Sequence, residues 1–268
     1  MKLAASSPMI PGHTLTQKAE LLKRWGYDAL AVFQPLAEWD DGVRRELASL
    51  ESRTGIRPVE FVLIDDIYGH AMDPDPELRA RCRAMYLDAA SVCAEIGTVT
   101  EIEYEYGARD PLPLFHPFQQ LDEGQRDRFL DFYREVLEVV EGTPGRVLLE
   151  PINRYECRYL NLVADNLAMI EAVDHPNAAL LPDTFHMSIE EVDVASSILA
   201  AGEKVAHVHL GDNNRLLPGH GRLDWESIFG ALHEIGFTGA VNLECSTEGD
   251  PAESLPATAE RLRALMGA

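Results

Sequence analysis

Short apolar runs rich in β-branched residues alternate along the chain with longer stretches whose apolar positions recur at helical spacing. Continuous apolar runs of this length are typical of strands buried on both faces, and the longer stretches are typical of amphipathic helices that cover a sheet. The pattern predicts eight strands, at residues 3–6, 29–33, 59–64, 99–104, 147–151, 179–183, 205–210 and 240–244.

Start and stop signals support the helical stretches between these strands. Thr14 with Gln17 predicts a capping box at the start of the first helix. Asp75 precedes a proline at the first helical position, and Gly97 is suited to end the long helix that follows. The alternation therefore consists of repeated strand–helix units.

Eight strand–helix units in 268 residues leave two architectures, a closed barrel or an open, doubly wound parallel sheet. The nucleotide-binding form of the open sheet carries GxGxxG or GxxxxGK[ST] after its first strand, and neither motif follows the first strand here. With no obvious edge strand in the pattern, the sequence predicts an α/β fold, a (β/α)8 TIM barrel that occupies residues 1–268 as a single domain.

The charge and the cysteines narrow the choice of partners and compartment. Forty-five acidic residues against 23 basic ones give a formal net charge of −22, which repels nucleic acid and anionic lipid, so we expect neither partner. The four cysteines form no CxxC pair, and no apolar run is long enough for a signal peptide or a membrane span. We therefore expect reduced thiols and a cytoplasmic location.

The last four predicted strands each carry, at or near their end, a side chain that can bind a metal ion: Glu150, Asp183, His209 and Glu244. In a parallel barrel the carboxyl ends of the strands meet at one face, so we expect these side chains to lie together. A single acid after a strand is as often a surface cap, but four candidates in succession favour a site. His207 would lie one layer deeper than His209, as a hydrogen-bonded support.

Three carboxylates and one imidazole form a hard, mostly oxygen ligand set. The set predicts one divalent metal ion, with Mn²⁺ as the first choice and Mg²⁺, Co²⁺ or Zn²⁺ as alternatives. Four protein ligands leave two octahedral positions for adjacent oxygens of a small-molecule sugar or keto-polyol.

Four segments of the second half resemble the xylose-isomerase-like superfamily of barrels and, within it, the ketose 3-epimerases of the tagatose and psicose epimerase group. The segments are LEPINRYE (149–156), LLPDTFHMSIEE (180–191), HVHLGDNNRLLPGHGRLDW (207–225) and VNLEC (241–245). The first half of the chain resembles these proteins only in its order of elements.

The resemblance implies a role for each matching residue. Glu150 and Glu244 would bind the metal and also move protons, whereas the other two ligands would only bind it. Three further residues would bind the substrate: Glu156, His186 and Arg215. Members of the group often form dimers or tetramers, so a homo-oligomer is also an expectation.

This assignment agrees with the chemistry of sugars. A hydrogen next to a ketone is weakly acidic, and a metal ion that polarises the neighbouring oxygens acidifies it further and stabilises the enediolate. A 3-epimerase removes the proton from one face of the carbon and returns one to the other, which two opposed carboxylates can do. The sequence thus predicts a divalent-metal-dependent sugar isomerase or epimerase, acting by ketose 3-epimerisation. With no clear lysine cluster to bind phosphate, a free sugar is the expected substrate.

Three alternatives stay open at this point. A dehydratase acting on a keto-inositol or a dehydroshikimate uses a similar site, and a non-catalytic sugar-binding barrel would bind metal without turnover. An apurinic endonuclease needs further histidines after the second and third strands, where only His70 is found, and the acidic charge argues against DNA.

The first half departs from the group in ways that bear on the substrate. No aromatic residue follows the first strand, and no tryptophan follows the fourth. Carboxylates expected near the ends of the second and third strands are not obvious, although Asp65 and Asp66 can fill the latter position. Residues 115–118 (Phe-His-Pro-Phe) are a candidate lining for the substrate pocket.

Overall fold

The computed structural model describes residues 1–108, 112–114, 119–247 and 249–267, and its eight strands form one parallel sheet. All eight predicted strands are confirmed. Their bounds are β1 Lys2–Ser6, β2 Ala29–Pro35, β3 Arg57–Ile64, β4 Val99–Ile102, β5 Arg146–Leu149, β6 Ala178–Leu180, β7 His207–Leu210 and β8 Ala240–Leu243.

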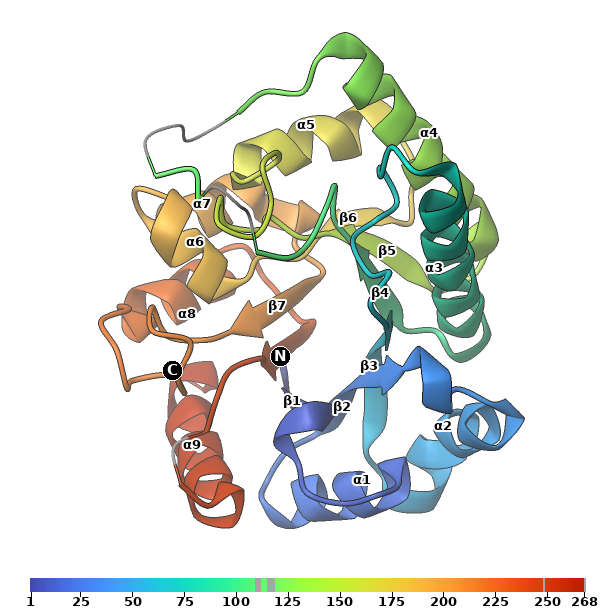
Figure 1. The fold of residues 1–268 in the computed structure, drawn as a ribbon. Coiled ribbons are helices and arrows are strands. Elements are labelled where there is room, and N and C mark those ends of the chain that lie inside the picture. Colours follow the sequence, from blue (N-terminus) through green and yellow to red (C-terminus); the bar gives the residue numbers. More distant parts are fainter. Residues whose placement is uncertain (109–111, 115–118, 248, 268) are drawn as a thin grey trace.

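The sheet curls into a nearly closed barrel (Figure 1). The strand order is β6-β5-β4-β3-β2-β1-β8-β7, and every neighbouring pair is parallel. The bridges Leu180–Val205 and Asp183–His209 join the β6 and β7 segments across the remaining seam. The predicted TIM barrel is therefore the observed fold.

Helices alternate with the strands and surround the barrel (Figure 1). They are α1 Leu15–Arg24, α2 Asp41–Thr54, α3 Pro76–Ile96, α4 Glu123–Val140, α5 Val163–Val173, α6 Thr184–Glu190, α7 Val194–Ala201, α8 Trp225–Glu234 and α9 Pro251–Met266. Short 3-10 turns cover Ser7–Met9, Leu36–Glu38 and Gly202–Lys204. Within the described ranges, no helix combines the length and the apolar character that a membrane crossing requires.

The predicted helix signals are observed. The Thr14 side chain accepts from the Gln17 backbone N–H while the Gln17 side chain accepts from the backbone of Thr14, so the capping box is complete. Asp75 caps α3 by accepting from the N–H of Glu77, and Gly97 ends the helix in the left-handed conformation at φ 70°.

The apolar core divides between two places. The large cluster packs the helices against the outside of the sheet, and a small apolar layer of Leu148, Ala179 and Leu181 fills part of the barrel interior. Other interior positions are polar. Glu60 of β3 and His207 and His209 of β7 are buried to 1% exposure or less. A polar interior is unusual for a packed barrel and marks where the candidate site begins.

Candidate metal and substrate site

The four predicted metal ligands converge. Glu150 directly follows β5, Asp183 precedes α6, His209 lies in β7, and Glu244 directly follows β8. One ligand atom from each residue lies within 4.8 Å of the others. Their convergence follows from the parallel barrel, which brings the carboxyl ends of the strands to one face.

Asp183 is oriented by the helix that it begins. Its Oδ1 accepts hydrogen bonds from the N–H groups of Phe185 (2.6 Å) and His186 (3.3 Å), as an N-cap does. Its Oδ2 faces the other way and accepts from Nη1 of Arg215 at 3.0 Å. One oxygen is thus committed to the backbone while the other remains directed at the site.

The two ring nitrogens of His209 face different groups. Nδ1 lies 2.9 Å from Oε2 of Glu244 and 3.4 Å from Oε1 of Glu150, whereas Nε2 faces Glu60. Among the described residues, neither Nδ1 of His209 nor Oε1 of Glu150 has a hydrogen-bond partner, although both atoms are buried. Unpaired buried polar atoms are costly, and a divalent cation among these ligands would satisfy them. The residues present therefore fit a metal ion.

Glu150 and Glu244 differ in their affinity for a proton. Burial raises the pKa of Glu150 well above its ordinary value and outweighs the opposing effect of His209, while the nearby Glu244 and Asp183 carboxylates add smaller increases. Burial also acts to raise the pKa of Glu244, but the positive charges of His209 and Arg215 outweigh it and lower that pKa to about 2. Two carboxyls with opposite protonation preferences are suited to acid–base work.

The pKa of the His209 imidazole is likewise subject to opposing effects of burial and of neighbouring charges. Burial acts to lower its pKa, but the carboxylates of Glu60, Glu244 and Glu150 overcome this effect and hold the pKa well above its usual range. Since a metal ligand must offer a free lone pair, binding of a cation at Nδ1 would displace a proton.

A cavity of about 410 Å³ opens above these ligands. Of the predicted residues, Glu150, His186, Arg215 and Glu244 line it, so the carboxylates, the histidine and the arginine face one space. Its volume is in the range of small-molecule sites. Asp65 and Asp66, after β3, also line it, in the position suggested for them.

His186 is fixed through the LEPINRYE segment. Its Nδ1 lies 2.6 Å from Nδ2 of Asn153 and 3.3 Å from the Asn153 backbone nitrogen, and both of these atoms are donors. Nδ1 must therefore accept, and the proton of the neutral ring lies on Nε2. Burial, with a contribution from Arg215, lowers the pKa of His186, which keeps the ring neutral. Nε2 lies 3.3 Å from Nη1 of Arg215, which can only donate, so with the proton on Nε2 these two nitrogens do not hydrogen-bond to each other and both are donors for a substrate oxygen.

Glu156 hydrogen-bonds to the same asparagine, Asn153, but does not face the cavity. Its Oε1 accepts from Nδ2 of Asn153 at 2.8 Å, and it is not among the residues that line the cavity. The carboxylate is thus linked to His186 through Asn153. Its role in binding a substrate remains a prediction.

Arg215 lies across the acidic cluster. Nη1 is 3.0 Å from Oδ2 of Asp183, Nη2 is 3.2 Å from Oε2 of Glu244, and the guanidinium lies 4.6 Å from the centre of the Phe185 ring. Its backbone adopts φ 60°, a conformation that side-chain-bearing residues rarely adopt. A strained backbone at a charged residue in a cavity is typical of functional positions.

Sequence reasoning missed several residues of the first half that the barrel brings to the site. Glu60 contacts His209, Glu101 of β4 lines the cavity, and Tyr68 and Tyr106 contribute aromatic walls. The acids at the end of the fourth strand had a detectable signal, since Glu101 and Glu103 are two residues apart within the predicted strand 99–104 and would share a face. Tyr106 supplies an aromatic residue after the fourth strand.

The hydroxyl of Tyr68 lies between Glu101 of β4 and Glu103, just after that strand, and donates to their carboxyl oxygens at 3.0 Å and 2.6 Å. Burial raises the pKa of Glu103 to about 7 despite these hydrogen bonds. The suggested pocket residues 115–118 lie outside the described part of the chain.

This protein is a parallel barrel in which a carboxylate–histidine cluster lies under a cavity at the carboxyl ends of the strands. It therefore falls in the class of α/β barrels whose strand ends could hold a metal ion. The chain belongs to the xylose isomerase-like TIM barrel family, whose model matches residues 19–265.

Similar proteins include named epimerases. The chain is 32% identical to a D-psicose 3-epimerase of Ruminiclostridium cellulolyticum over 173 residues, which are 64% of this chain and 57% of that protein. It is 29% identical to a probable ketose 3-epimerase of Synechocystis sp. over 258 residues, which are 89% of this chain and 85% of the other. The match to the first relative thus spans little more than half of its length.

The fold is also similar to solved structures. A D-psicose 3-epimerase from Clostridium cellulolyticum H10, crystallised with D-tagatose, superposes with a TM-score of 0.82 at 25% identity, covering 99% of each chain.

Proposed function

We propose that this protein is a divalent-metal-dependent ketose 3-epimerase with a single barrel domain. The observation that carries the proposal is the pair Glu150 and Glu244, which lie 3.4 Å and 2.9 Å from Nδ1 of His209 and both line the cavity. The names of the similar proteins, psicose and ketose 3-epimerases, support the same reaction.

The proposed site holds one ion between Glu150, Asp183, His209 and Glu244, with Mn²⁺ as the first choice. When bound, the ion supplies positive charge that acidifies the hydrogen beside the sugar carbonyl. Glu244, whose pKa is low, is the carboxylate that starts without a proton, and Glu150 is the carboxyl that starts with one.

In one direction of the proposed reaction, Glu244 removes the proton from one face of C3 and Glu150 returns its proton to the other face. Each turnover inverts one carbon and leaves the two carboxyls with exchanged protonation states. The Nε2–H of His186 and the guanidinium of Arg215 donate to the oxygens on which negative charge develops. The reverse reaction uses the same two groups in opposite order.

A screen of ketoses in deuterated water, with Mn²⁺ or Co²⁺ added and NMR as the readout, tests this proposal. We expect the C3 epimer to form with deuterium on C3. Loss of water from a keto-polyol, seen as a mass change, would identify a dehydratase instead. Metal binding with no deuterium incorporation across the screen would favour a non-catalytic sugar-binding barrel.

A further inference from the structure

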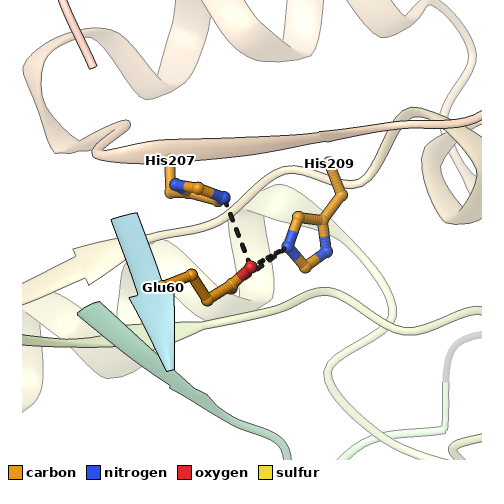
Figure 2. A group of neighbouring side chains, drawn as sticks. All are labelled: Glu60, His207 and His209. Atoms are coloured by element: carbon orange, nitrogen blue, oxygen red, sulfur yellow. Dashed lines mark hydrogen bonds and ion pairs between the residues drawn. The ribbon is translucent and has the colours of Figure 1, made fainter. Parts of the chain in front are cut away.

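Three buried side chains, Glu60, His207 and His209, lie together, and His209 is also a candidate metal ligand (Figure 2). Glu60 comes from β3, and His207 and His209 are two residues apart in β7, so they share one face of that strand. Nε2 of His209 lies 3.1 Å from Oε1 and 3.0 Å from Oε2 of Glu60, and Nε2 of His207 lies 3.4 Å from Oε2. Glu60 is fully buried and does not line the cavity. A substrate in the cavity would therefore not touch Glu60. Any effect of Glu60 on the metal site would act through its contact with His209.

The direction of this contact determines which nitrogen of His209 is available. An ionised carboxylate can only accept hydrogen bonds, so Nε2 of His209 must carry the proton that Glu60 accepts. Nδ1 is then the nitrogen with the free lone pair in the neutral ring, and it is the atom beside Glu150 and Glu244. Carboxylates that orient metal-ligating histidines in this way are common in metal sites.

We propose that Glu60 is the positioning residue of the metal site: it holds the proton of His209 on Nε2 and so directs Nδ1 to the ion. The inference rests on the proposed metal site but not on the identity of the sugar. His207 contacts the same oxygen of Glu60, Oε2, with its ring perpendicular to that of His209 at 88° and 5.3 Å between centroids. The hydrogen bond of Glu60 is therefore made to His209, and His207 packs beside it.

An alternative use of the same three residues is a second metal site, since Glu60, His207 and His209 each offer a ligand atom within 4.8 Å of the others. The contact between Nε2 of His209 and both oxygens of Glu60 favours a proton between them, because a bound ion would have to replace that hydrogen bond. The two arrangements differ in metal stoichiometry, which is one per chain for the positioning role.

The test compares Mn²⁺ binding to the purified metal-free protein, to Glu60→Gln and to Glu190→Gln, followed by electron paramagnetic resonance of free Mn²⁺. Glutamine keeps the shape and one acceptor oxygen but removes the charge, so we expect Glu60→Gln to weaken binding about 10–100-fold. Glu190 is the matched control: it is also a buried carboxylate, but it pairs with Arg154 and belongs neither to the group of candidate ligands nor to the cavity lining. We expect Glu190→Gln to bind Mn²⁺ as the wild type does.

A second measurement needs no variant. In ¹⁵N NMR spectra of the zinc-loaded wild type, His209 should carry its proton on Nε2. A proton on Nδ1, unchanged Mn²⁺ affinity in Glu60→Gln, or two ions per chain would each overturn the proposal. If the wild type bound neither Mn²⁺ nor Zn²⁺, the proposed function would fail with it. If the wild type binds metal and epimerises a ketose while Glu60→Gln does the same with equal affinity, only this inference fails.

Discussion

Glu150 and Glu244 occupy equivalent places after β5 and β8, yet their surroundings give them different proton affinities. Glu244 contacts Arg215 at 3.2 Å, whereas the pKa of Glu150 is set chiefly by burial, which outweighs the opposing effect of His209. The arginine is therefore a source of the asymmetry. A proton transfer between two faces needs such a difference, because one group must accept while the other donates.

Replacing either carboxylate by its amide should separate proton removal from epimerisation. For Glu150→Gln and Glu244→Gln, assayed at saturating Mn²⁺, we expect the rate of C3 inversion to fall roughly 10²–10⁴-fold, because one face loses its acid–base group. Each variant should still exchange the C3 hydrogen of one epimer with deuterium, through the remaining carboxylate. NMR in deuterated water measures both rates. Epimerisation at the wild-type rate in either variant would contradict the two-carboxylate mechanism.

Arg215 should not tolerate lysine. A lysine keeps the charge but cannot reach Asp183 and Glu244 with two nitrogens of one rigid plane while it lies over Phe185. The loss of a charged hydrogen bond of about 1.5–3 kcal/mol corresponds to a decrease in kcat/KM of roughly 10–100-fold. Steady-state kinetics of Arg215→Lys check this value. Exposed Arg134→Lys serves as the control and should behave as the wild type does.

The segment between β7 and α8 carries Arg215 and is held by one buried side chain, Asp212. Its carboxylate accepts from the indole N–H of Trp225 at 3.0 Å and from the backbone N–H groups of Gly219 (2.8 Å) and Leu223 (3.1 Å). Burial acts to raise the pKa of Asp212, but these donors outweigh it and lower the pKa below 3.8. The position of Arg215 thus depends on an anchor several residues away.

Asp212→Asn should destabilise this segment. The amide leaves part of the donor set unpaired, at a cost of about 1–3 kcal/mol in the free energy of unfolding. Because the folded pKa lies below the unfolded value, the carboxylate's contribution is fully present above pH 3.8 and is lost as the pH falls through the folded pKa. Urea unfolding at pH 7 should therefore separate variant and wild type, and the difference should shrink below pH 3.8. A constant difference across this range would contradict the assignment.

The elements of the barrel were predictable because strands buried on both faces read as continuous apolar runs. Glu60 was not predicted as a site residue for the same reason. It lies in the first half of β3, where the pattern leads one to expect an apolar residue. Tyr106 was not predicted to line the cavity because β4 was expected to extend to residue 104. The strand ends at Ile102, and residues that follow it belong to the cavity wall. Tyr68 lies in a loop, where periodicity carries no information about which side chains meet.

The second half of the site was predictable because each of its four ligands lies at or just after the end of its own strand, and the topology of the barrel alone brings such ends together. The contacts that orient these ligands and shift their pKa values depend instead on which side chains pack against each other across the barrel interior. Glu60 and His209 are distant in the sequence and come from β3 and β7, which do not pair with each other in the sheet.

At the scale of the molecule, the chain carries a formal net charge of −22, and several of its acids are buried together at one end of the barrel. Mutual repulsion of buried carboxylates destabilises the folded state unless protons or cations compensate for it. Since a metal ion would bind the folded chain and not the unfolded one, its binding energy adds to the stability of the whole barrel.

Removal of metal should therefore lower the melting temperature of the entire molecule. With the ion at about 100 times its dissociation constant, binding contributes about 2.7 kcal/mol, which corresponds to a decrease of roughly 5–10 °C on chelation. Thermal unfolding with excess Mn²⁺ and with a chelator measures the shift. The shift should diminish at acidic pH, because His209, whose pKa is raised, must release its proton before the ion can bind through Nδ1. Asp183→Asn, which weakens the ligand set, should show a smaller shift than the wild type, and an equal shift in both would place the bound metal elsewhere.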